Sequence, residues 1–298
     1  MIVKRNLSAR RVLEYTAGPM AWAGLWAVVA PLVHVLTDDA RLILPFPAVA
    51  TLGAALAIFV AFRNNSAFAR WNEARAAWQT VLVASRTLVR QIVAATRHAA
   101  GSGTVTEEQA ADIQRRVGEL LVEFAWSLAA VTRPSRAAPH AHGTDRRPDL
   151  VLIDVAATIK AGIGTGALGQ FDPISTEPQL VALNSAQGAI ERIATTPTLR
   201  QYDYFTRRLI GLFALVTPFA LVGLTPDAVW LATPLALLLA GTFVVLAVTG
   251  AANDEPFANR VTDVPIDAIC TQLEHDVLTA IGHPDPPRPL APVDGYLW

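Results

Sequence analysis

The sequence predicts an all-α integral membrane protein with four transmembrane helices that continue into a helical region in water. Hydrophobic residues make up 52% of the chain and charged residues only 16%, whereas soluble domains have about 25% charged residues. Several uncharged stretches are long enough to cross a bilayer, and the more polar remainder keeps a helical spacing of apolar residues. The net charge of −1 gives no argument for binding nucleic acid.

The first two spans are expected at about residues 17–37 and 42–62. The second holds 21 residues without a charge, and at about 1.5 Å per residue this length crosses a hydrocarbon core of about 30 Å. After Phe62 the sequence becomes polar, but neither Pro nor Gly occurs between Gly53 and Gly101. The helix is therefore predicted to leave the membrane and to continue into water.

The third and fourth spans are expected at about residues 209–226 and 228–250. The turn between them, around Pro226 and Asp227, is short, so the two helices should be antiparallel neighbours. Four basic residues lie within residues 1–16, whereas the short connections between spans carry aspartates. The positive-inside rule therefore places both termini in the cytoplasm.

The rest of the chain, about 63–208 and 251–283, is predicted to form a cytoplasmic helical region, followed by an extended tail at 284–298. Thr106 and Gln109 have the spacing of a capping box at a helix start. Pro178 is predicted to begin another helix, and Asp263 to cap the last one.

No residues suggest an enzyme, a cofactor or a metal site. Paired carboxylates, an HExxH sequence and a nucleophile elbow do not stand out. His140 and His142 lie in a Pro- and Arg-rich stretch, which is typical of a solvated loop. The single cysteine, Cys270, excludes an intrachain disulfide and is predicted to be buried on a helix.

Three segments resemble signatures of bacterial bestrophins. They are FRNNSAFARWNEAR at 62–75, ERIATTPTLRQY at 191–202 and DEPFANRVTDVPIDAIC at 254–270. The segments lie in family order, and the resemblance covers nearly the whole chain. The signature positions are Arg63, Asn64, Asn65, Arg70, Trp71, Pro197, Pro256 and Phe257.

The resemblance implies that residues 1–298 form one channel domain, which assembles as a homopentamer around a central pore in a bacterial inner membrane. Its partners would be permeant monovalent ions, membrane lipid and copies of itself, with no nucleic acid. The neck-lining positions of the family fall on Ala54, Ile58 and Phe62, which recur every four residues. The cytoplasmic aperture of the family falls on Thr198. Calcium binding is not expected, because Asn259 and Arg260 stand where animal members carry acids.

Three interpretations of function remain open. The resemblance favours a channel for anions such as chloride, but Phe edges face anions whereas Phe faces attract cations. The first alternative is a channel of the same architecture that selects monovalent cations such as sodium. The second is a membrane-anchored interaction or signalling protein that does not conduct ions.

Overall fold

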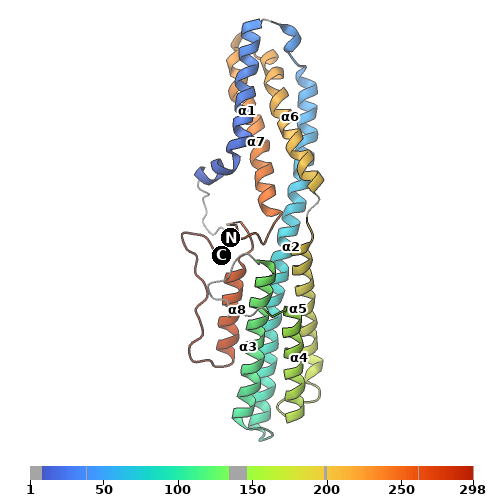
Figure 1. Ribbon diagram of the computed structural model, residues 1–298, viewed down its shortest axis with the longest axis vertical. Helices are drawn as coiled ribbons and strands as arrows, with labels where there is room; N and C mark the ends of the chain where they lie inside the picture. Colours follow the sequence, from blue (N-terminus) through green and yellow to red (C-terminus); the bar gives the residue numbers. More distant parts are fainter. Residues whose placement is uncertain (1–8, 38, 134–145, 198–199, 261, 298) are drawn as a thin grey trace. The chain divides into compact units, whose positions relative to one another are not determined.

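A computed structural model describes residues 9–37, 39–133, 146–197, 200–260 and 262–297 of the chain, and it is all-helical (Figure 1). Within these ranges the only β pairing is one isolated bridge between Val293 and Tyr296. The elements are α1 (Ala9–Thr37), η1 (Ala40–Leu42), α2 (Phe46–Gly101), α3 (Glu107–Thr132), α4 (Pro148–Thr165), α5 (Asp172–Thr195), α6 (Arg200–Leu224), η2 (Pro226–Leu231), α7 (Ala232–Asn253) and α8 (Ile266–Ala280). The predicted all-α class is confirmed.

The helices form two compact units. The span unit comprises Lys4–Arg70 and Pro197–Glu255, and the bundle unit includes Trp71–Thr196 and Pro256–Trp298. Helix α2 runs without a break from Phe46 to Gly101 and contributes to both units. The unbroken helix after Phe62 agrees with the absence of Pro and Gly from this stretch.

The span unit contains the four helices that are long and apolar enough to cross a membrane, as predicted. Helices α1, α6 and α7 pack against one another, and α6 and α7 run antiparallel (Figure 1). Where they meet, Ala23, Ala214 and Ala240 form a buried cluster. Such small residues let helix backbones approach closely, which is how helices associate in lipid.

The connection between α6 and α7 is a separate short helix. Residues 226–231 form the 3-10 helix η2, and α7 begins only at Ala232. The backbone of Ala228 leaves the helical region, with φ at −146°. The uncharged stretch from Ala228 onward is therefore not one straight helix, because the chain turns here before it enters α7.

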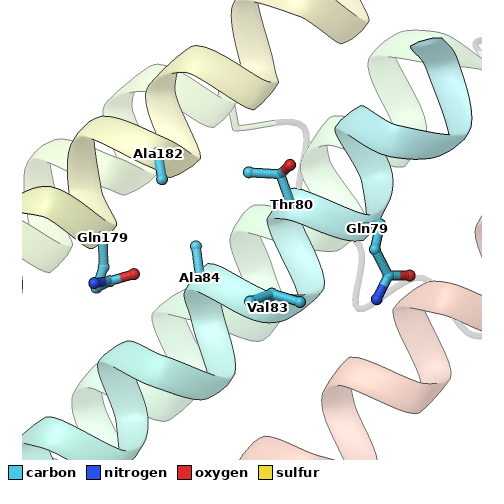
Figure 2. A pocket seen from close by; sticks show the side chains of 6 residues that line it. All are labelled: Gln79, Thr80, Val83, Ala84, Gln179 and Ala182. Atoms are coloured by element: carbon cyan, nitrogen blue, oxygen red, sulfur yellow. The ribbon is translucent and has the colours of Figure 1, made fainter.

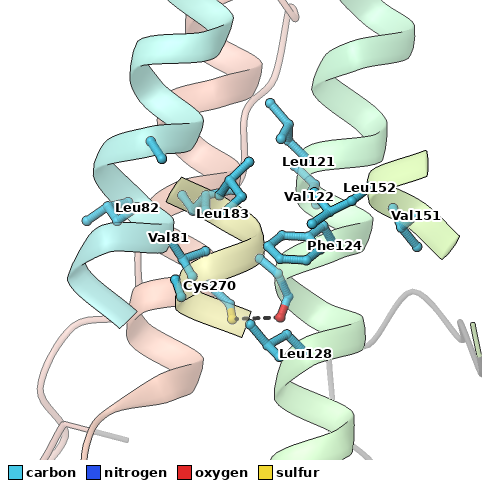
Figure 3. Close-up of a cluster of buried hydrophobic side chains, with 14 of the residues drawn as sticks. Val81, Leu82, Leu121, Val122, Phe124, Leu128, Val151, Leu152, Leu183 and Cys270 are labelled. Atoms are coloured by element: carbon cyan, nitrogen blue, oxygen red, sulfur yellow. Dashed lines mark hydrogen bonds between the residues drawn. The ribbon is translucent and has the colours of Figure 1, made fainter. Parts of the chain in front are cut away.

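The bundle unit has its own hydrophobic core, to which α2, α3, α4, α5 and α8 all contribute. Figure 3 shows Phe124 of α3 among side chains from the other helices, including Val81, Leu183 and Cys270. The predicted capping box at the start of α3 is present: Gln109 N–H donates to Thr106 Oγ1, and Thr106 N–H donates to Gln109 Oε1.

Two predicted helix starts are wrong. Pro178 lies inside α5, which begins at Asp172 and has Pro173 in its first turn. Proline has no N–H, so Pro178 leaves the carbonyl of Ile174 without its helical donor; Ile174 is 74% exposed, so water can reach this region.

Asp263 does not cap the last helix either. Helix α8 begins at Ile266, directly after Pro265. Asp263 is buried, and its Oδ2 accepts a hydrogen bond from Arg260 N–H at 2.8 Å. The carboxylate therefore closes the turn that precedes the helix.

The capping box gives a test of the bundle unit. Thr106→Ala removes the acceptor for one N–H of the first turn and should lower the free energy of unfolding by about 1 kcal/mol. Thr87→Ala is the control, because the exposed Thr87 hydroxyl donates only to Val83 O of its own helix. Thermal unfolding of the detergent-solubilised protein measures both, and equal melting temperatures would contradict a stabilising cap.

Candidate functional site

The predicted neck residues lie on an exposed stripe of α2. Ile58 is 60% exposed and Phe62 70% exposed, and Ala54 lies on the same side. Leu56 and Val60, on the other side of the helix, are each 1% exposed because they pack in the core of the span unit. The described chain thus leaves large apolar side chains uncovered beside a well-packed face. Such an uncovered apolar patch marks contact with lipid, another protein or a pore.

Directly after this stripe, the guanidinium of Arg63 is buried. It is 8% exposed, and its Nη2 donates to Asp203 Oδ1 of α6 and, at 3.3 Å, to Asp254 Oδ2 at the end of α7. Its Nη1 donates to the Ala247 carbonyl of α7 at 2.9 Å. A charge out of water is costly unless it is paired and hydrogen-bonded, and the planar fork of arginine supplies several donors at once.

The cluster contains a second arginine. Arg207 Nε lies 2.8 Å from Asp203 Oδ2, so Asp203 pairs with two guanidinium groups, one buried and one exposed. We call Arg63, Asp203, Asp254 and Arg207 the ion-pair cluster. Burial raises the pKa of the Asp254 carboxyl above its ordinary value, although the neighbouring Arg63 lowers it in part.

Asn64 and Gly250 form a close contact between α2 and α7. Asn64 Nδ2 donates to the Leu246 carbonyl at 2.9 Å. A Cβ atom placed on Gly250 would lie 1.8 Å from Asn64 Oδ1 and 3.3 Å from Arg63 Nη1. Only glycine therefore fits at position 250 while Asn64 and Arg63 keep these positions.

The remaining signature residues lie in both units. In the bundle unit, Trp71 Nε1 donates to the Thr262 carbonyl at 3.0 Å, and Pro256 and Phe257 are buried, with Val264 N–H donating to the Pro256 carbonyl. In the span unit, Arg63 and Asn64 make the contacts above, Arg70 is partly buried, and Asn65 and Pro197 are exposed. Thr198 lies outside the described residues, so its predicted place at an aperture stays a prediction.

The partners of Arg63 were not predicted from the sequence. Asp203 precedes the third apolar span and Asp254 follows the fourth, so both lie on the same side of the predicted membrane as Arg63. This shared side was the signal available in the sequence. A lone arginine at the end of an apolar helix requires carboxylates, and these two are among the few acids placed to provide them. Gly250 gave no sequence signal, because glycines are common in transmembrane helices.

The surface hollow of the bundle unit is not a candidate catalytic or metal site. A shallow hollow of about 240 Å³ lies between α2 and α5 and is lined by Gln79, Thr80, Val83, Ala84, Gln179 and Ala182 (Figure 2). None of these six side chains is charged or titrates near neutral pH. Among the described residues, no three His, Cys, Asp or Glu side chains gather in a way that could hold a metal ion. His140 and His142 lie outside the described residues.

Gly250→Ala should lower the free energy of unfolding by about 1–3 kcal/mol, because the added methyl group overlaps Asn64. The double variant with Asn64→Ala should recover part of this loss. Gly211→Ala is the control, because nothing lies within 4 Å of the methyl group added there. Thermal unfolding in detergent tests all three, and a Gly250→Ala variant as stable as Gly211→Ala would contradict the close contact.

The chain is similar to known proteins over most of its length. Residues 6–279 match the sequence model of the family described as bacterial/fungal bestrophin protein. The voltage-dependent anion channel-forming protein YneE of Escherichia coli is 28% identical over 257 residues, which cover 82% of this chain and 80% of YneE. A voltage-dependent anion channel-forming protein of Mesorhizobium japonicum is 28% identical, with 79% of this chain and 75% of that protein covered. A crystal structure of a bacterial bestrophin homologue from Klebsiella pneumoniae has a TM-score of 0.76 at 26% identity, covering 90% of this chain and 99% of that one.

Proposed function

Because this chain belongs to the bacterial/fungal bestrophin family, we propose that it is an ion channel that conducts small anions such as chloride through a homopentamer. The protein is a multi-pass membrane protein with four apolar helices of sufficient length. The observation that carries the proposal is the stripe of Ile58 and Phe62, which the chain leaves 60% and 70% exposed, while Leu56 and Val60 on the other side of the helix are buried. Both relatives compared above bear the name of anion channel-forming proteins.

Five copies of this stripe around an axis would make stacked apolar rings. Successive positions four residues apart advance by about 40° around a helix, so Ala54, Ile58 and Phe62 share one broad face. A narrow apolar tube loses water readily and gates by dewetting. Ala54 is the smallest of the three and would leave one end of the neck wider.

The proposal extends to the rest of the chain. We place the protein in the bacterial inner membrane with both termini in the cytoplasm, since Arg207 and Arg208 precede the apolar part of α6. The chain would act as one channel domain, with Thr198 at a second, cytoplasmic constriction. We propose a structural role for the bundle unit, because its buried residues form a continuous hydrophobic core.

A cation channel of the same architecture is the alternative. The apolar stripe itself carries no charge, and a Phe ring faces an anion with its edge and a cation with its face. The names of the relatives favour anions, and the sign of the reversal potential distinguishes the two.

Reconstitution into planar bilayers under asymmetric potassium chloride is the test of the channel. We expect currents whose reversal potential lies towards the equilibrium potential of chloride, from a protein that runs as a pentamer when its mass is measured in detergent. A reversal potential towards that of potassium would establish the cation alternative. A monomer or dimer that passes no ions would contradict the channel and favour a membrane-anchored interaction or signalling protein.

The neck predicts a pair of opposite substitutions. Ile58→Ala with Phe62→Ala removes bulk from two rings and should raise the open probability at least about fivefold, while Ala54→Ile should reduce the current. Leu238→Ala with Val245→Ala is the matched control, since both side chains are exposed on α7 (67% and 40%) and lie outside the stripe. Single-channel recording measures these effects. A double alanine variant that assembles and gates like the parent would show that the neck is not the gate.

A further inference from the structure

The two faces of α2 are held by different kinds of contact. Leu56 and Val60 bury one face through apolar contacts, which are non-directional. The stripe with Ile58 and Phe62 has no cover within the described chain. Apolar packing of one face holds the helix in the unit but sets its rotation about its own axis only loosely.

Arg63 supplies the directional contacts that the apolar face lacks. It follows Phe62 by one residue, so its side chain leaves the helix about 100° away from that of Phe62. Its two Nη atoms donate to Asp203 of α6, to the Ala247 carbonyl of α7 and to Asp254 after α7. Hydrogen bonds weaken steeply when their angles change, so a turn of α2 would break these bonds before it broke the apolar contacts.

We infer that Arg63 is a positioning residue for the neck. Its bonds to Asp203 and Asp254 fix the rotation of α2 at which Phe62 faces the ion path. Release of the Asp254 contact, by substitution or by acid, lets α2 turn about its axis and widens the ring that the Phe62 side chains would form. This role rests on the proposed function, because it concerns ion flow only if α2 lines a pore.

Acid bears on the Asp254 carboxylate of the cluster. The charged groups that act on Asp254 are Arg63 and Arg70 of α2, Asp203 of α6 and the adjacent Glu255. Burial raises the pKa of Asp254, so its carboxylate takes up a proton at a higher pH than an ordinary aspartate does. The folded chain then binds this proton more tightly than the unfolded chain, and acid therefore costs no stability at this residue.

Asp203 differs from Asp254 because it has two guanidinium partners, Arg63 and Arg207. Loss of the Asp254 charge thus removes one of the two charged contacts of Arg63, and the pair between Arg63 and Asp203 does not depend on it. The expected result is a looser α2 in an intact protein, which separates a positioning role from a merely structural one.

The experiment places a nitroxide on Phe62→Cys of the full chain in lipid vesicles. The native thiol of Cys270 is fully buried within the bundle unit, and burial raises its pKa well above the usual value, so it stays unlabelled. Label mobility and the distances between labels are read at about pH 7 and about pH 4, near the ordinary pKa of an aspartate. Asp254→Asn and Arg63→Gln are compared with Asp112→Asn, which removes a carboxylate from an exposed pair with Arg115.

In the parent, the distance distribution should be narrow at neutral pH and at least about twofold broader in acid. Asp254→Asn should be broad at both pH values, and so should Arg63→Gln, whereas Asp112→Asn should behave like the parent. Open probability, recorded without the label, should rise about fivefold in acid in the parent. In Asp254→Asn it should be raised already at neutral pH and should not respond further.

A pH response that survives in Asp254→Asn, or a distribution that stays narrow in that variant, would overturn the inference. If Arg63→Gln does not fold, Asp254→Asn decides alone, because it keeps the shape of the side chain and removes a partly buried charge. Ion currents without any response of the labels would refute the positioning role and leave the channel standing. Labels that respond as expected in a protein that passes no ions would refute the channel and leave the anchoring of α2 standing.

Discussion

The burial of one guanidinium directly after the apolar part of α2 constrains the span unit. Arg63 is 8% exposed, so its charge must be balanced by carboxylates brought from elsewhere, and the unit supplies Asp203 from α6 and Asp254 from the end of α7. These demands fix where the start of α6 and the end of α7 lie against α2. Glycine is required at position 250 for the same reason, because α7 approaches Arg63 and Asn64 so closely that a side chain there would have no room.

The charges of the ion-pair cluster cancel, and this affects how selectivity is to be explained. Arg63 and Arg207 balance Asp203 and Asp254, so the cluster has no net charge when all four groups are ionised. The neighbouring Phe62 is also uncharged. If the proposed channel prefers anions, this cluster and Phe62 supply no net charge for that preference, which would come from the orientation of rings and backbone dipoles or from charges elsewhere.

Sequence reasoning succeeded where one periodicity or one local pattern determines structure. The four apolar helices follow from length and absence of charge, and the cap formed by Thr106 and Gln109 follows from their spacing. It failed where two local explanations competed: Pro178 resembled a helix start but lies in a helix whose first turn already holds a proline, and Asp263 resembled a cap but closes a turn. A prediction of the carboxylates around Arg63 would have required knowing which helices meet there. That information is not present in any single segment.

The alanine cluster formed by Ala23, Ala214 and Ala240 has a thermodynamic consequence of its own. An alanine side chain has no rotamers to lose when it is buried, so α1, α6 and α7 come together at this point without side-chain conformational entropy opposing them. In a bilayer, where lipid tails are as apolar as the helix surface, no hydrophobic driving force is available to overcome such a loss. A layer of methyl groups thus makes a contact whose weak attraction is not reduced by any loss of side-chain rotamers.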